Sequence, residues 1–306
     1  MDKTVAMFAG QGAQAVGMGR DLVEAFPVCR QLFDRASEAL GYDLAATCFE
    51  GPIEKLTRTD VCQPAIFVAS AASLAALRER RPGFRFDFAA GLSLGEWTAL
   101  YAAGAVGFEQ CVRILEARGR FMQEACDATP STMVCILRLP FAAVEDICAK
   151  SGAAMANINS AEQIVLSGTK EQCADAARLA AEARGRAVPL AVAGAYHSAF
   201  MAPAAKALAE RLAGETFRVP EVPVLSNVTG RPHAPDADSI RQAMVDQVTH
   251  PVRWLDTVQW LRGPDAGAAT FVEFGPGKTL SGLVKRIDRD ASATSIDGVA
   301  ALDALP

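Results

Sequence analysis

Short runs of apolar residues alternate with longer amphipathic stretches along most of this chain. Residues 5–9 and 86–90 are apolar runs that lead into glycine, which is typical of strands buried on both faces. Further buried strands are expected at residues 222–225 and 270–274. Helical patterns lie at residues 20–40, 63–80 and 95–103. This order predicts an α/β fold with a mostly parallel sheet covered by helices on both faces.

The rhythm changes between about residues 131 and 192. Six elements are expected there: strands at 132–139, 153–158, 163–166 and 187–192, and helices at 141–150 and 171–184. The order βαββαβ is that of a ferredoxin-like unit. We therefore expect a discontinuous large domain, residues 1–126 and 195–306, with a small ferredoxin-like subdomain inserted at residues 127–194. The last dozen residues are expected to be a frayed tail.

Composition narrows the class of protein. The chain is 51% hydrophobic and 21% charged, with a net charge of -5, which favours a globular protein and argues against a nucleic-acid partner. No apolar run of about 18 residues is free of charges and turn signals, so no membrane span is expected. The N-terminal apolar run is too short for a signal peptide. The eight cysteines include no C-x-x-C pair, so neither a zinc site nor disulfides are expected. Reduced thiols predict a cytoplasmic location.

A G-x-S-x-G motif at residues 91–95 lies between a predicted strand and a predicted helix. In that setting the serine stands on a sharp turn, and the following helix directs free N–H groups at an oxyanion formed on it. The alternative is a glycine-flanked serine in an ordinary turn. The strand–turn–helix context favours Ser93 as a nucleophile.

A serine hydroxyl needs a base, and the chain has three histidines. His233 lies in a proline-rich segment expected to be a surface loop, and His250 precedes a proline at a helix boundary. His197 lies between a strand and a helix, where catalytic residues of α/β folds collect. A structural histidine of the interior is the alternative, but His197 is the best candidate for the base.

Arg118 lies in the apolar stripe of a helix expected at residues 109–125. Its guanidinium stays charged, so burial without an anion would be costly. The anion could be a carboxylate of the fold, or the head could reach out to solvent. Equally, Arg118 could await a substrate carboxylate, which a guanidinium grips with two N–H donors. The pattern alone leaves these readings open.

With these residues in view, the sequence resembles the malonyl-CoA:acyl-carrier-protein transacylases of fatty-acid synthesis and the acyltransferase domains of polyketide synthases. The resemblance runs from about residue 5 to residue 286. It rests on the order and spacing of segments at residues 8–12, 63–65, 93–96, 118–125, 159–160, 197, 226–228, 251–254 and 273–278. It implies an α/β-hydrolase-like large domain.

The resemblance also implies roles for individual residues. Ser93 carries the acyl group, and His197 is general base and then general acid. A backbone carbonyl near Gln247 orients the imidazole, and the backbone amides of Gln11 and Leu94 form the oxyanion hole.

Further implied roles concern the substrate. Arg118 pairs with the malonyl carboxylate, and Gln63 and Asn159 line the active-site gorge. Leu94 and Tyr196 resemble malonyl-selective members, in which bulk crowds an α-methyl branch by about 1–3 kcal/mol. One departure is Leu92, because the family usually has histidine before the serine.

The carrier protein of this family is acidic. Lys278, Lys285, Arg286 and Arg289 lie on or beside a helix predicted after Gly277, and we expect them to dock it. Ordinary solvated charge is the alternative.

The function expected is transfer of malonyl from malonyl-CoA to acyl carrier protein through a malonyl-serine, by a monomer that uses no metal or other cofactor. The alternatives are a stand-alone polyketide acyltransferase, an acyl-thioester hydrolase, or a non-catalytic docking module for the carrier protein.

Overall fold

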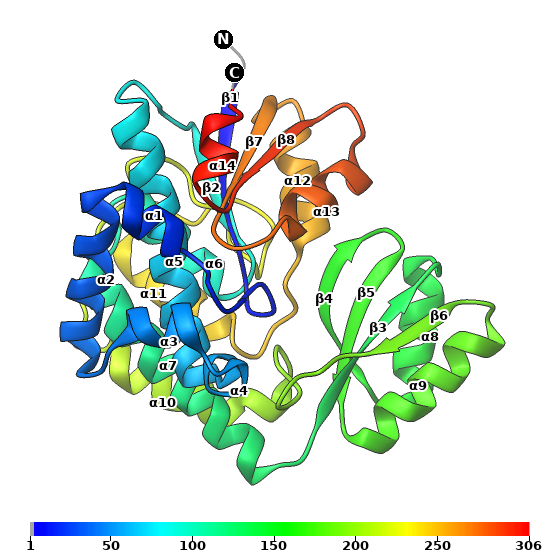
Figure 1. Ribbon diagram of the computed structural model, residues 1–306. Helices are drawn as coiled ribbons and strands as arrows, with labels where there is room; N and C mark the ends of the chain where they lie inside the picture. Colours follow the sequence, from blue (N-terminus) through cyan, green and yellow to red (C-terminus); the bar gives the residue numbers. More distant parts are fainter. Residues whose placement is uncertain (1–2, 306) are drawn as a thin grey trace.

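The computed structural model describes residues 3–305 and contains two four-stranded sheets (Figure 1). The large sheet has the order β2-β1-β7-β8, and every neighbouring pair is parallel. Its strands are β1 (Lys3–Phe8), β2 (Phe88–Gly91), β7 (Ala268–Phe274) and β8 (Ser292–Ile296). The predicted parallel sheet is confirmed.

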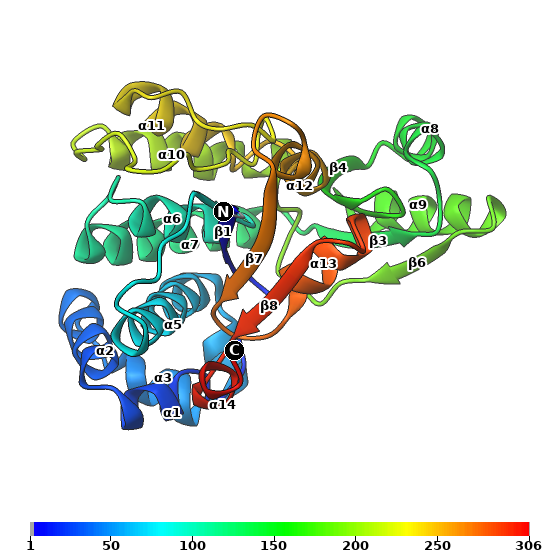
Figure 2. The same cartoon turned by 90° about the horizontal axis from the view of Figure 1, so that it is seen from above.

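Helices cover both faces of the large sheet. Alternate residues of β1 point to opposite cores: Ala6 and Phe8 to one, and Val5 and Met7 to the other. All four are fully buried, which explains the unbroken apolar run. Figure 2 shows α5 (Thr59–Arg80), α6 (Leu94–Ala102) and α7 (Phe108–Ala128) on one side of the sheet, and α12 (Trp254–Arg262) and α13 (Thr279–Ile287) on the other.

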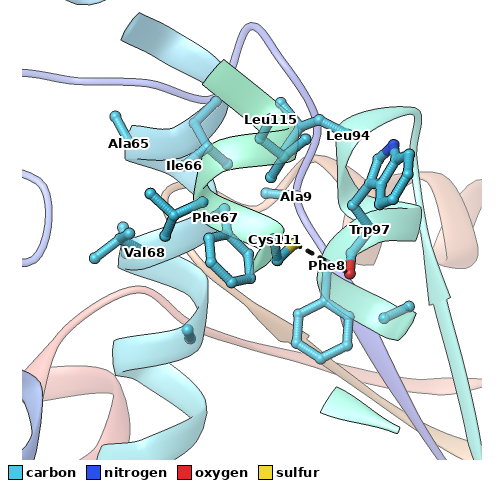
Figure 3. Close-up of a cluster of buried hydrophobic side chains, with 14 of the residues drawn as sticks. Phe8, Ala9, Ala65, Ile66, Phe67, Val68, Leu94, Trp97, Cys111 and Leu115 are labelled. Carbon is cyan, nitrogen blue, oxygen red and sulfur yellow. Dashed lines mark hydrogen bonds between the residues drawn. The ribbon is translucent and has the colours of Figure 1, made fainter. Parts of the chain in front are cut away.

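Further helices pack around the large sheet and its neighbouring helices. They are α1 (Arg20–Ala25), α2 (Pro27–Leu40), α3 (Leu44–Glu50), α4 (Ile53–Thr57), α10 (Ala202–Leu212), α11 (Ala237–Asp246) and α14 (Val299–Asp303), with a 3-10 turn η1 (Ala199–Met201). The larger core packs Phe8 and Phe67 beside Trp97 and Leu115, and the Cys111 thiol donates to the Trp97 carbonyl oxygen at 3.8 Å (Figure 3).

Helix α5 is long and apolar enough to cross a membrane by length and composition alone. However, 89% of its most apolar stretch is buried inside the fold. It packs against α7 and α2, so its apolar composition is that of a central core helix.

The small sheet has the order β4-β5-β3-β6, with every neighbouring pair antiparallel. Its strands are β3 (Thr132–Leu137), β4 (Ala154–Ser160), β5 (Gln163–Gly168) and β6 (Arg186–Pro189). Helices α8 (Phe141–Ser151) and α9 (Lys170–Glu182) pack on one face. Apolar side chains of the other face join the core of the large sheet. We call residues 132–189 the small unit.

Three local expectations were wrong. Residues 222–225 form isolated bridges, Val224 to Ala89 of β2 and Leu225 to Pro232, and no strand beside β2, because Pro223 accepts from the Ala89 amide but has no N–H to donate. The helix expected over residues 20–40 is broken at Pro27 into α1 and α2. Residues 295–305 are not frayed, since Ile296 of β8 and Leu302 of α14 are buried, and residue 306 lies outside the described residues.

Candidate active site

Ser93 stands on the turn between β2 and α6. Its φ of 55° and ψ of -107° are unusual for a residue with a side chain, as expected for a nucleophile held on a strained bend. The flanking glycines are required by space. A Cβ on Gly91 would lie 2.0 Å from the backbone of Gly95, and a Cβ on Gly95 would lie 2.2 Å from the Phe8 carbonyl oxygen.

His197 meets Ser93 at hydrogen-bond distance. Its Nε2 lies 2.9 Å from Ser93 Oγ, and its Nδ1 lies 2.8 Å from the Gln247 carbonyl oxygen. Because a carbonyl oxygen only accepts, Nδ1 carries the proton and Nε2 presents a lone pair to the hydroxyl. Burial, with the nearby charge of Arg118, lowers the pKa of His197 to about 4. The imidazole is therefore neutral at neutral pH and able to accept a proton.

Arg118 reaches the same point from α7, with only 1% of its surface exposed. Its Nη1 donates to Gln63 Oε1 at 2.6 Å, and its Nη2 donates to Ser93 Oγ at 3.1 Å and to Gln247 Oε1 at 2.9 Å. Its buried Nε has no hydrogen-bond partner among the described residues 3–305. Burial lowers the pKa of Arg118 to about 10, partly offset by the charge of Glu96, so the side chain remains a cation at neutral pH.

The structure excludes two of the three interpretations of Arg118 given above. The guanidinium does not reach solvent. Within residues 3–305, no carboxylate forms an ion pair with it, and its direct partners are neutral. A buried cation with an unpartnered donor beside a serine hydroxyl is suited to receiving an anion from a ligand.

Gln63 and Gln247 support this arrangement. The prediction that Gln63 lines the gorge was wrong, because Gln63 is fully buried on α5 and contacts Arg118 rather than the cavity. Gln247 contributes its side chain as well as its carbonyl: Nε2 donates to the Ser93 carbonyl oxygen at 3.0 Å and to Glu96 Oε2 at 2.5 Å. The resemblance assigned only a nearby carbonyl to this residue.

A cavity of about 370 Å³ opens over Ser93 and His197. Gln11 and Leu92 in loops and Met122 on α7 form one wall. Met133 on β3, Asn157 on β4 and the segment 190–193 after β6 form the other. Tyr196 also lines the cavity, and its hydroxyl lies 2.9 Å from Thr59 Oγ1. Leu92 presents an apolar wall where the resembling family usually has histidine.

The two predicted oxyanion-hole residues, Gln11 and Leu94, are placed differently relative to the cavity. Gln11 lines the cavity. Leu94 is the first residue of α6, so its N–H has no carbonyl one turn earlier in the helix. The Leu94 side chain packs in the hydrophobic core (Figure 3) and is not among the residues that line the cavity. Leu94 can therefore act at the site only through its backbone.

The prediction that Asn159 lines the gorge was wrong. Asn159 is buried on β4, but Asn157 lines the cavity in its place. The resemblance alone had assigned Asn159 to the gorge, and the register of β4 shifts between Met155 and Asn157 and again between Ile158 and Ser160.

Sequence reasoning gave no role to three groups below the nucleophile. The Asn227 side chain accepts from the Ser93 amide at 2.6 Å and donates to the Gly91 carbonyl oxygen at 2.7 Å, which braces the turn. Glu96 is fully buried, and His233 Nε2 lies 2.7 Å from its Oε1. Glu96 and Asn227 lie in two segments that carry the resemblance, residues 93–96 and 226–228. The segments alone do not show which contacts these side chains make.

The predicted docking cations lie on or beside α13, outside this cluster. Lys278, Lys285 and Arg286 are exposed. Lys285 Nζ donates to the Ala291 carbonyl oxygen at 2.5 Å, and Arg286 donates to Gln163 Oε1 at the start of β5. Among residues 3–305, no three or more His, Cys, Asp or Glu side chains are grouped to hold a metal ion.

Comparison with known proteins places this geometry in a family. The acyl transferase domain matches residues 5–299. The malonyl CoA-acyl carrier protein transacylase of Bacillus subtilis is 41% identical, over 94% of this chain and 92% of its own length. That of Escherichia coli K12 is 39% identical, over 99% of both chains.

Solved structures agree. The malonyl-CoA:acyl carrier protein transacylase from Xanthomonas oryzae is 40% identical, covers 99% of this chain and 98% of its own, and superposes with a TM-score of 0.94. A malonyl-transacylase solved in complex with its type II polyketide acyl-carrier protein is 39% identical, covers 98% of each chain and has a TM-score of 0.93. The chain belongs to the acyl transferase family and, within it, to the malonyl-CoA:acyl-carrier-protein transacylases.

Proposed function

We propose that this chain transfers malonyl from malonyl-CoA to the phosphopantetheine thiol of acyl carrier protein, through an ester on Ser93, in fatty-acid synthesis. The observation that carries the proposal is one cluster: Ser93 Oγ lies 2.9 Å from His197 Nε2 and 3.1 Å from Arg118 Nη2. A hydroxyl between a neutral base and a buried cation is suited to attack on an acyl group that bears a carboxylate.

In the first half-reaction, Ser93 Oγ attacks the thioester carbonyl carbon while its proton passes to His197 Nε2. The Gln247 carbonyl oxygen holds the Nδ1 proton and stabilises the imidazolium that forms. The backbone amides of Gln11 and Leu94 bind the oxyanion. The carbon–sulfur bond then breaks, and the CoA sulfur takes the proton from Nε2.

The second half-reaction reverses these steps. The carrier-protein thiol gives its proton to His197 and attacks the ester, and Ser93 recovers its proton as it leaves. Arg118 holds the malonyl carboxylate throughout, which favours malonyl over acetyl. The cycle needs only protein groups and calls on no cofactor. Because the largely apolar cavity walls restrict water around the ester, transfer is favoured over hydrolysis.

We also infer that the exposed cations Lys278, Lys285 and Arg286 dock the acidic carrier protein. They provide a basic surface on a chain of net charge -5, which would orient an acidic partner.

For the fold, we propose an α/β-hydrolase-like large domain, residues 1–126 and 195–306, and a ferredoxin-like subdomain, residues 127–194. The parallel large sheet with a serine on the strand–turn–helix bend supports the first assignment. The element order βαββαβ and the antiparallel small sheet support the second.

The matched relatives differ in how much of their own length this chain covers. The polyketide biosynthesis protein ThaF of Burkholderia thailandensis is 39% identical, but this chain covers only 24% of it. The transacylases of Bacillus subtilis and Escherichia coli are covered over 92% and 99% of their lengths.

Incubation with labelled malonyl-CoA followed by intact-mass measurement tests the proposal. The wild-type chain should gain one malonyl group, which holo acyl carrier protein then removes and carries. Ser93→Ala should gain none. A malonyl adduct that persists in Ser93→Ala, or malonate released without labelled carrier protein, would contradict the transfer mechanism.

A further inference from the structure

A fully buried carboxylate, Glu96, lies on the first turn of α6 below the nucleophile. His233 Nε2 donates to Glu96 Oε1 at 2.7 Å. Gln247 Nε2 at 2.5 Å and the backbone N–H of Asn227 at 3.1 Å donate to Oε2. A carboxylate so completely removed from water depends on such donors. None of the steps proposed above uses Glu96 or His233.

Glu96 is a counter-charge to Arg118 that does not touch it. The Gln247 side chain lies between them, with Oε1 accepting from Arg118 Nη2 at 2.9 Å and Nε2 donating to Glu96. Direct pairing would occupy the guanidinium. Because the Gln247 amide separates Glu96 from Arg118, the carboxylate stabilises the positive charge of the guanidinium without occupying its N–H donors. These donors stay available for a ligand carboxylate.

The carboxylate also fixes which way the Gln247 amide points. With Nε2 held by Glu96, Oε1 must face Arg118, whereas the opposite orientation would set an NH₂ group against a guanidinium. The same residue orients His197 through its backbone carbonyl, 2.8 Å from Nδ1. The placement of Gln247 therefore bears on both Arg118 and His197.

His233 secures the other oxygen of this carboxylate. The backbone N–H of His233 anchors the loop that carries it by donating to the Val224 carbonyl oxygen at 2.8 Å. Its side chain is only 3% exposed, although the neighbouring prolines had suggested a surface loop. The interaction joins residues 137 positions apart.

We propose that His233 is a positioning residue for acyl transfer: by donating to Glu96 it holds the carboxylate that orients Gln247, and so sets Arg118 for the malonyl carboxylate. This inference rests on the roles proposed above for Ser93, His197 and Arg118. His233 touches neither substrate nor the reacting atoms. Its loss should weaken selection of malonyl rather than abolish acyl transfer.

The test compares kcat/KM for malonyl-CoA and acetyl-CoA in His233→Phe, His233→Gln and wild type. Phenylalanine fills the space without a donor, and removal of a hydrogen bond to a charged group should lower the malonyl-to-acetyl ratio about tenfold or more. Glutamine can donate again and should restore much of the ratio. Lys206→Gln, at an exposed lysine of α10, serves as the control and should leave the ratio unchanged.

The nearly isosteric Glu96→Gln variant decides the question if His233→Phe does not fold. It should also lower the ratio, and adding His233→Gln to it should change little, because the two residues act in one chain of contacts. An unchanged ratio, or parallel losses with both substrates, would overturn the inference. A Ser93 adduct in the wild type shows separately that the proposed function stands, and its absence would refute that function instead.

Discussion

Arg118→Gln removes the guanidinium beside Ser93 but leaves a side chain that can still form hydrogen bonds. In the malonyl ester, the carboxylate lies two carbons beyond the carbonyl. Arg118 Nη2 already contacts Ser93 Oγ at 3.1 Å, so the guanidinium is close enough to meet that carboxylate. Acetyl has no carboxylate and makes no such contact. The substitution should therefore separate the two substrates.

The expected size follows from the hydrogen bonds between the guanidinium and the malonyl carboxylate that the substitution removes. A hydrogen bond to a charged group contributes about 1.5–3 kcal/mol, so a two-pronged grip contributes roughly 3–6 kcal/mol. Since about 1.4 kcal/mol is a factor of ten, kcat/KM for malonyl-CoA should fall by about 10² to 10⁴. The change with acetyl-CoA should stay within about tenfold, because only the support around Ser93 is altered.

The assay measures CoA release with each thioester in the presence of holo acyl carrier protein. Arg113→Gln is the matched control, because Arg113 lies on the exposed face of the same helix. Intact folding of both variants is checked by thermal unfolding. Equal losses with malonyl-CoA and acetyl-CoA would refute the carboxylate contact, and so would a comparable loss in Arg113→Gln.

Two further predictions concern pH and docking. Because burial and Arg118 lower the pKa of His197 to about 4, kcat/KM for loading should hold down to about pH 5 and fall as the base is protonated near pH 4. In Arg118→Gln this acid limb should move upward, and a wild-type limb near pH 6.5 would contradict the assignment. Reversing Lys285 and Arg286 to Glu should raise KM for the carrier protein but spare malonyl-CoA loading, with exposed Lys206→Glu as control; equal loss in both half-reactions would count against docking.

Two of the predicted site residues, Ser93 and Arg118, followed from local patterns, whereas His197 was chosen among three histidines and Gln247 was implied by the resemblance. Ser93 was identified because a strand, a turn with small neighbours and a helix follow one another along the chain. Arg118 was identified because the helical period fixes which face each residue of α7 occupies. Both predictions depend on geometry that a few successive residues determine.

What could not be predicted depends on contacts between distant segments. His233 was expected on a surface loop, and nothing near it in sequence shows that its ring turns inward to Glu96. Asn159 was assigned to the gorge by the resemblance alone, and the sequence did not show that Asn157 lines the cavity instead. Even for Arg118, the sequence left the choice of anion open, because the pairing partners of a buried cation are a property of the assembled core.

The small unit holds the proposed base in place as well as walling the cavity. Ser167 Oγ of β5 donates to the Tyr196 carbonyl oxygen at 2.6 Å, one residue before His197. On β4, the Ile158 amide donates to the Val252 carbonyl oxygen, and the Val252 amide donates to the Ala156 carbonyl oxygen, both at 2.8 Å. Val252 lies on the segment that follows the carbonyl orienting His197.

Ser93, by contrast, is fixed by the large sheet through the backbone contacts that its flanking glycines allow. The 2.9 Å contact between Ser93 Oγ and His197 Nε2 thus joins a group held by one sheet to a group braced by the other. Proton transfer requires that contact to stay near hydrogen-bond distance. The packing of the small unit against the rest of the fold therefore bears on the distance between the proposed nucleophile and the proposed base.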